Sequence, residues 1–199
     1  MADGYEDAQA GIAALNAGNN EEAIMRLTRA LDSGQIRDGD RASAFFDRGL
    51  AWANRGENDR AIRDYTDAIR LNPKLADAYR SRGVAWVRKG ENTRALADFT
   101  KAISLNAQDP DTYEGRGLAW INAGEYYKAV ADFNESIRLN PKDGISFHYR
   151  GLAWLNVNEF DKAIADFDEA IRINAQDAVA YFYRGLTKFA VGRFTLEVE

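Results

Sequence analysis

Residues that commonly carry catalysis or hold a metal ion are scarce in this chain. Its 199 residues include one histidine, His148, and no cysteine. A metal site with two histidines, a thiolate site and a cysteine nucleophile are therefore excluded, and a Ser-His triad has no histidine beyond His148. No glycine-rich phosphate motif follows a strand pattern. We therefore expect no catalytic residue, no metal ligand and no cofactor, and we interpret His148 as a packing or groove residue of a non-enzymatic protein.

Charged residues, by contrast, recur with a constant spacing. An arginine is followed 16 residues later by an aspartate in four places: Arg48 and Asp64, Arg82 and Asp98, Arg116 and Asp132, Arg150 and Asp166. A partly buried guanidinium needs a carboxylate partner, so these residues favour internal ion pairs over an anion-binding row of arginines. The corresponding places near the N-terminus hold Ala10 and Arg26, so both members of the pair are absent there together.

The spacing belongs to an internal repeat. A glycine three residues before a tryptophan recurs every 34 residues, from Gly49 and Trp52 to Gly151 and Trp154. The repeats span 4–41, 42–75, 76–109, 110–143 and 144–177, and 178–199 form a partial sixth repeat or capping helix. We number positions within each repeat from its first residue. The first repeat is four residues longer, and we expect the extra residues in the polar loop 32–35.

The repeat pattern predicts two helices per unit. Positions 4, 7, 8 and 11 form one stripe of a helix, and positions 20, 24 and 27 form a stripe of a second helix. Aromatic residues at positions 4 and 24 face glycine or alanine at positions 8, 20 and 27, which lets the paired helices approach closely. Position 15 predicts the turn between them, because glycine and asparagine accept the left-handed conformation: it holds Gly18, Gly56, Gly90, Gly124, Asn158 and Gly192.

The order of aromatic, glycine, aromatic, alanine, aromatic and proline in a 34-residue unit resembles the tetratricopeptide repeat. The resemblance covers nearly the whole chain, so it implies one array over 1–199. It implies an all-α fold, a right-handed α-solenoid of antiparallel helix pairs. It further implies a protein–protein interaction scaffold that captures a peptide segment or a partner helix in a concave groove lined by the first helix of each repeat.

Positions 9 and 12 of these first helices are apolar throughout, so they either are covered by the neighbouring first helix or form the floor of the groove. Positions 5, 6 and 13 lie beside that stripe and vary more between repeats, so they are the candidate partner-binding positions. The candidates are Phe46, Asn54, Arg80, Glu114, Asn122, His148, Tyr149, Asn156, Phe182 and Tyr183. The asparagines have an alternative interpretation as solvated or capping residues near helix ends.

Some members of this family grip the C-terminal carboxylate of chaperones with Lys and Asn or Arg at positions 2, 5, 6 and 9. The corresponding places in the first three repeats hold Ala8, Ile12, Asp47, Asp77 and Ser81. We therefore do not expect a clamp for chaperone tails.

The C-terminal helix supports an alternative function, self-assembly into a homo-oligomer. Repeat arrays normally end in a polar face, but this helix carries Tyr181, Leu186 and Phe189. Residues 194–199 are too few for a full partner helix, so the apolar face could pack against a second copy.

Composition limits the remaining classes of partner and the location. The formal net charge of -5 argues against binding to a phosphate backbone. No apolar run approaches the roughly 18 residues that cross a bilayer, so we expect neither nucleic acid binding nor membrane insertion. We expect a cytoplasmic protein by default, with a periplasmic or secreted protein after removal of a signal peptide as the alternative.

Overall fold

The computed structural model describes residues 3–197, and these residues fold into eleven helices. The helices group into two compact units, Met1–Ala107 and Gln108–Glu199. Within the described residues no helix is long and apolar enough to cross a membrane.

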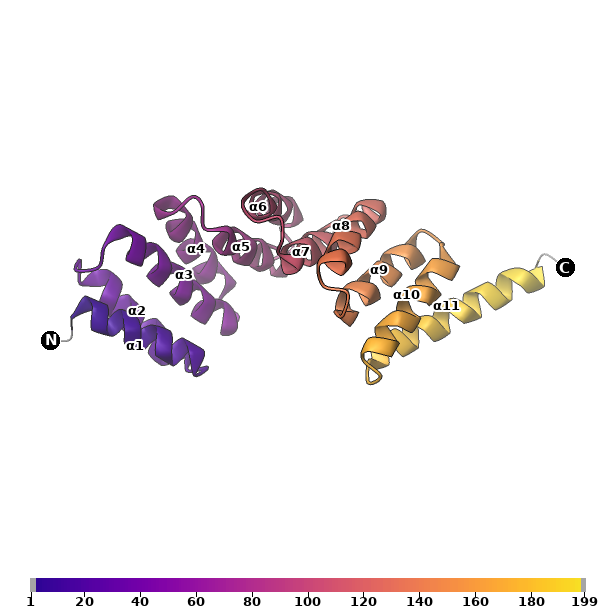
Figure 1. Ribbon diagram of the computed structural model, residues 1–199, viewed down its shortest axis with the longest axis horizontal. Helices are drawn as coiled ribbons and strands as arrows, with labels where there is room; N and C mark the ends of the chain where they lie inside the picture. The colour runs from indigo at the N-terminus through magenta and orange to yellow at the C-terminus, as the bar shows by residue number, and fades with distance from the viewer. Residues whose placement is uncertain (1–2, 198–199) are drawn as a thin grey trace. The chain divides into compact units, whose positions relative to one another are not determined.

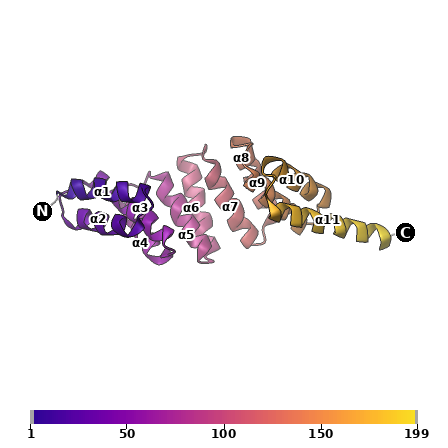
Figure 2. The same ribbon diagram turned by 90° about the horizontal axis from the view of Figure 1, so that it is seen from below.

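Three helix pairs form the first unit (Figure 1, indigo to magenta). The helices are α1 (Gly4–Asn16), α2 (Asn20–Asp32), α3 (Asp38–Asn54), α4 (Asn58–Leu71), α5 (Ala76–Arg88) and α6 (Asn92–Leu105). Each first helix packs against the second helix of its own repeat, as Figure 2 shows for α1 and α2. The first helices also contact one another, α1 with α3 and α3 with α5.

The second unit continues the pattern and adds one helix. Its helices are α7 (Pro110–Asn122), α8 (Tyr126–Leu139), α9 (Gly144–Asn156), α10 (Phe160–Ile173) and α11 (Ala178–Glu197). α7 pairs with α8 and α9 with α10, and α11 packs on α10 and α9. The expected all-α solenoid of helix pairs is confirmed, while its handedness and its continuity as one array over 1–199 stay predictions.

Small residues let the paired helices approach closely. A Cβ added to Gly49 would lie 2.6 Å from the ring of Tyr65, and one added to Gly117 would lie 2.8 Å from the ring of Phe133. The aromatic rings at position 24 have at most 1% of their surface exposed. Glycine at position 8 is therefore required by the fit of a ring from the second helix.

Five of the six predicted turns are confirmed. Gly18, Gly56, Gly90 and Gly124 have φ between 75° and 78°, and Asn158 has φ 62°. The prediction of a turn at Gly192 is wrong, because α11 runs through that residue to Glu197. The predicted short tail 194–199 is thus helical as far as the structure describes it, and residues 198–199 lie outside the described residues.

The predicted place of the four extra residues is also wrong. The segment between α2 and α3 has five residues, against four between α4 and α5, whereas α3 has 17 residues against 13 in α5. The insertion mainly adds a turn to the N-terminus of α3. Asp38 and Asp40 lie in this added first turn, where acidic side chains interact favourably with the helix dipole.

Candidate functional site

The repeated arginines form internal ion pairs, as expected. Arg48 donates from Nε and Nη2 to the two carboxylate oxygens of Asp64, both at 2.8 Å. The same two bonds join Arg82 to Asp98, Arg116 to Asp132 and Arg150 to Asp166 at 2.6–2.8 Å. The bond to Asp132 raises the pKa of Arg116 above its ordinary value. These carboxylates are buried, so the arginines join two helices of one repeat and do not form an anion site.

The third arginine nitrogen reaches the preceding repeat. Nη1 of Arg48 donates to Thr28 Oγ1 at 3.0 Å, and Nη1 of Arg82 donates to Thr66 Oγ1 at 2.9 Å. Nη1 of Arg150 donates to Asn134 Oδ1 at 2.6 Å. Each of these arginines therefore also ties one repeat to the one before it.

The first repeat has an ion pair of reversed polarity that the sequence pattern did not reveal. Arg26 on α2 lies 3.0 Å from Asp7 on α1 and 2.7 Å from Glu22. Asp7 is buried and takes the place of the aromatic at position 4. In this repeat the acid is on the first helix and the arginine is on the second, the reverse of the other repeats.

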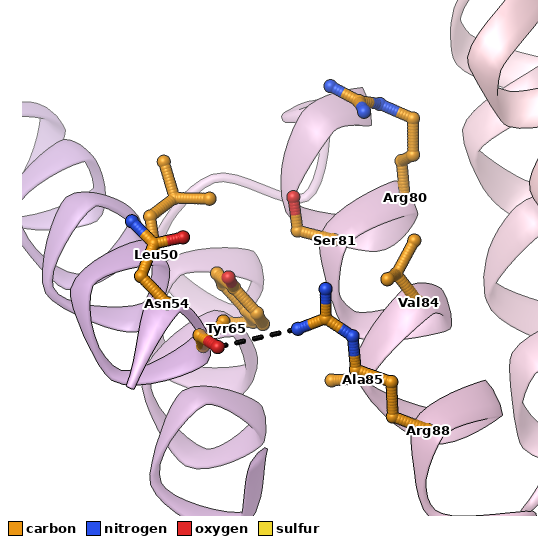
Figure 3. A pocket seen from close by; sticks show the side chains of 9 residues that line it. Leu50, Asn54, Tyr65, Arg80, Ser81, Val84, Ala85 and Arg88 are labelled. Carbon is orange, nitrogen blue, oxygen red and sulfur yellow. Dashed lines mark hydrogen bonds between the residues drawn. The ribbon is translucent and has the colours of Figure 1, made fainter. Parts of the chain in front are cut away.

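A groove of about 150 Å³ lies between α3 and α5 (Figure 3). Leu50 and Ala53 of α3 form one wall, Val84 and Ala85 of α5 form the other, and the ring of Tyr65 from α4 lies at the base. Polar side chains around these apolar ones complete the lining: Asn54, Arg80, Ser81 and Arg88. Leu50 and Val84 at position 9 and Ala53 at position 12 therefore line a groove here.

Two of the lining residues depart from the repeat pattern, and two more occupy positions that vary between repeats. Position 24 holds Phe or Leu in the other repeats and Tyr65 here, and position 13 holds Asn in four repeats and Arg88 here. Positions 5 and 6 vary between the repeats, and here they hold Arg80 and Ser81. The fold does not need these departures, since neighbouring repeats fold without them. All four converge on one groove, which marks it as a candidate binding site.

The groove presents hydrogen-bond donors. Figure 3 shows Arg88 reaching back toward Tyr65 and Ser81, with Nη1 donating to the Ala53 carbonyl at 3.4 Å. Arg80 donates to Asp77 at 3.3 Å. Burial raises the pKa of the Tyr65 phenol, so this group stays neutral at the base of the groove. Two guanidinium groups beside apolar walls suit a carboxylate on a partly apolar ligand.

A second groove, of about 180 Å³, lies between α1 and α3 and has different chemistry. Tyr5, Ala8 and Ile12 line it together with Asp40, and its lining includes no basic residue. It therefore offers no comparable attraction to a carboxylate.

Of the predicted binding residues in the first unit, two lie at the groove and one packs in the core. Arg80 lies in the α3–α5 groove, and Asn54 lies at its exposed edge, where Nδ2 donates to Asn20 Oδ1 at 3.1 Å. Phe46 packs beside Tyr65, with ring centroids 5.9 Å apart, and belongs largely to the core.

In the second unit, Glu114 is part of a polar network. It accepts a hydrogen bond from Ser146 at 3.1 Å, and Ser146 lies 2.8 Å from the Ser136 hydroxyl. Burial and the neighbouring Asp143 raise the pKa of Glu114 to about 7. This carboxyl group therefore changes charge near neutral pH.

An aromatic cluster surrounds His148. Its ring contacts the rings of Tyr149, Phe167 and Tyr183 at 5.3–6.0 Å, and its Nδ1 lies 3.7 Å from Asp177. His148 is buried, and burial lowers its pKa. Phe182 lies beside this cluster and is largely exposed, at 64%.

The remaining candidates are at the surface. Asn122 and Asn156 are exposed, and Asn156 Nδ2 donates to the Leu152 carbonyl at 2.8 Å. That bond agrees with a local role near the helix end. The self-association candidates Tyr181, Leu186 and Phe189 are exposed on α11. Ligand binding by any of these residues stays a prediction.

Sequence reasoning did not select Tyr65, Ser81 or Arg88. Tyr65 belongs to a second helix and occupies a core position, so the repeat pattern does not place it at a groove between first helices. The available signal was that Tyr65 and Arg88 differ from the residues at their positions in the other repeats. That signal indicates a site only when the two residues are seen to line one groove with Ser81.

Comparison with known proteins identifies the repeat. A family model described as tetratricopeptide repeat matches residues 9–74, 53–111, 87–144 and 115–178. Among solved structures, a crystal structure of MamA is 24% identical, with a TM-score of 0.75, covering 84% of this chain and 96% of that one. YrrB, described as a tetratricopeptide repeat protein with an unusual peptide-binding site, is 20% identical with a TM-score of 0.77 and 92% of both chains covered. A tetratricopeptide repeat protein from Parabacteroides merdae is 20% identical with a TM-score of 0.81, covering 95% of this chain and 73% of that one.

Proposed function

Because this chain belongs to the tetratricopeptide repeat family, whose members are protein interaction scaffolds, we propose that it holds an acidic peptide segment of a partner protein in the α3–α5 groove. The convergence of Tyr65, Arg80, Ser81 and Arg88 on that groove carries the proposal. A non-enzymatic role agrees with the family.

The size of the groove favours a peptide side chain over a small-molecule ligand. Its volume of about 150 Å³ is below the ~300–1,000 Å³ of typical small-molecule pockets. One carboxylate side chain would enter it, and the peptide would continue over the exposed surface of the neighbouring first helices. Arginine binds carboxylates in a two-pronged geometry, which orients the ligand as well as attracting it.

Local charge supports an acidic ligand although the whole chain is acidic. The net charge of -5 repels acidic segments in general, whereas Arg80 and Arg88 attract one at this groove. Apolar contact with Leu50 and Val84 would select a segment with an apolar residue beside the carboxylate.

The test is to select peptides that bind the full chain from a library of nonapeptides randomised at every position. The affinity of the full chain for the best peptide is then measured. We expect enrichment of Asp or Glu at one position. Replacing Arg88→Asn inserts the residue that four other repeats carry, so it should preserve the fold and weaken binding about tenfold, as loss of a charged hydrogen bond does. Tyr65→Phe inserts the residue of three other repeats and should weaken binding less.

Arg70→Asn is the matched control, because Arg70 is an exposed arginine of α4 outside the groove and its loss changes net charge equally. An unchanged affinity for Arg70→Asn supports a local site. Selection without acidic enrichment, or equal loss for Arg70→Asn and Arg88→Asn, would refute the proposal.

A further inference from the structure

The α1–α3 groove combines apolar surface with a carboxylate, whereas the α3–α5 groove combines apolar surface with guanidinium groups. Ala8 and Ile12 of α1 line it together with Asp40 of α3. Ile12 is 38% exposed, so its side chain is open to a ligand. Asp40 accepts a hydrogen bond from Arg37 Nε at 3.3 Å, but Arg37 points into solvent and is 84% exposed. The groove therefore keeps an acidic edge.

Asp47 extends this acidic edge along α3. It follows Ser43 and Ala44 by four and three residues, and both of these line the groove, so the three residues share one face of the helix. Ser81, at the same repeat position as Asp47, lines the α3–α5 groove. Asp47 is half-buried and has no hydrogen-bond or ion-pair partner for its side chain among residues 3–192. Burial raises its pKa to about 6, so a cationic partner would stabilise its charged form.

These features suit the side chain of a lysine or an arginine. The aliphatic stem of either residue packs on apolar surface while its charged head stays near water. Ala8 and Ile12 offer the apolar surface, and Asp40 and Asp47 attract the head. The same two carboxylates repel an acidic side chain. The two grooves of the first unit therefore attract charges of opposite sign.

The two grooves are close enough for one extended peptide to reach both. They lie on either side of α3, and a helix with its side chains is about 10–12 Å across. Ser43 lines the first groove and Ala53 the second, about 15 Å apart along the axis of α3 at 1.5 Å per residue. The grooves are thus roughly 18 Å apart, which an extended segment covers in about five or six residues.

We propose that the acidic segment held in the α3–α5 groove also carries a lysine or an arginine, about five or six residues from its acid, and that the α1–α3 groove binds this basic side chain. The inference rests on the proposed function, because it assigns a second part of the same ligand. The segment lies across α3 with opposite charges at its two ends. A uniformly acidic segment would place an acid beside Asp40 and Asp47, so this arrangement selects against it.

The peptides selected from the nonapeptide library test the spacing. Nine extended residues span about 30 Å, so one peptide reaches both grooves. We expect lysine or arginine to be enriched five or six positions from the enriched Asp or Glu. Replacing that basic residue of the best peptide by alanine should weaken its binding to the full chain about tenfold, as loss of a charged hydrogen bond does. Fluorescence anisotropy with a labelled peptide measures the change.

The variant Asp47→Ser tests whether the basic residue lies at this groove. It inserts the residue that position 6 has in the next repeat, so the fold should be preserved. We expect it to bind the selected peptide about tenfold more weakly and the alanine-substituted peptide as the parent does, which is the pattern of two groups in contact. Asp67→Ser is the matched control, because Asp67 lies on α4 outside both grooves and its loss changes net charge equally.

The outcomes separate this inference from the proposed function. Acidic enrichment that depends on Arg88, without a basic residue at that distance, would overturn the inference and leave the proposed function standing. Equal weakening of both peptides by Asp47→Ser, or the same loss with Asp67→Ser, would also overturn it, because the effect would then be one of folding or net charge. Selection without acidic enrichment would overturn both.

Discussion

Arg82 on α5 and Asp98 on α6 form a two-pronged ion pair between the helices of one repeat. Nε donates to Oδ2 at 2.8 Å and Nη2 donates to Oδ1 at 2.7 Å. The side chains are 18% and 8% exposed, so solvent screens the pair little. Its geometry recurs in three other repeats, which makes the pair a regular part of the fold.

Removing the carboxylate should therefore be costly. We expect Asp98→Ala to lower the free energy of unfolding by about 3 kcal/mol, because the guanidinium of Arg82 would remain partly buried without its partner. Urea denaturation of the full chain measures this change. Asp67→Ala, which removes the exposed partner of Arg70, should cost less than about 1 kcal/mol. Equal costs for the two variants would contradict a structural role for the buried pair.

The glycine at position 8 predicts a steric effect. Gly151→Ala would place a Cβ 2.8 Å from Phe167, so the ring must shift within a fully packed core. We expect a loss of about 2 kcal/mol in the free energy of unfolding. The same change at Gly185 should not destabilise, because its Cβ meets nothing within 4 Å. Thermal or urea unfolding that leaves Gly151→Ala as stable as the parent would refute the close-packing argument.

Asn158 occupies the left-handed turn that glycine occupies in the preceding repeats. Its φ of 62° is strained for a residue with a Cβ, although asparagine tolerates it better than most. We expect Asn158→Gly to raise the free energy of unfolding by about 0.5 kcal/mol. The nearby Asn156→Gly should instead lower it, since Asn156 is helical and glycine is a poor helix former. A loss of stability in Asn158→Gly would show that the turn does not require this conformation.

Glu114 predicts a pH dependence. Its pKa in the folded chain is raised from 4.5 to about 7, mainly by burial. A raised pKa stabilises the fold while the group is protonated, so this contribution is present below about pH 4.5 and is lost as the pH rises through about 7. Glu114→Gln stays neutral, and we expect it to gain about 1–2 kcal/mol relative to the parent between pH 5 and pH 8, allowing for partial exposure. Urea unfolding at both pH values measures the difference, and a difference independent of pH would contradict the assignment.

The amino-acid sequence by itself determined the repeat, the helix pairs, five of the turns and the partners of the buried arginines. These features depend on side chains at fixed separations along the chain. In each of the last four full repeats a ring such as Phe167 packs against a glycine such as Gly151. The recurrence of the two residue types at the same separation therefore supports the same interpretation in every repeat. Periodicity therefore carries this information without coordinates.

Only the tertiary structure decided which departures from the repeat matter. Tyr65 and Arg88 lie 23 residues apart on different helices, and their convergence on one groove depends on how α4 and α5 pack. The ion pair of Arg26 and Asp7 likewise uses position 4, which is aromatic in the later repeats. The 16-residue spacing of the other ion pairs therefore does not predict it.

Gly192 shows the same limit for local conformation. Glycine permits a left-handed turn but does not require one, and the turns at the other glycines are held by a second helix that packs back on the first. At Gly192 the helix α11 instead continues to Glu197. The sequence determined what each residue can do, and packing against neighbouring helices decided which of those conformations and contacts occur.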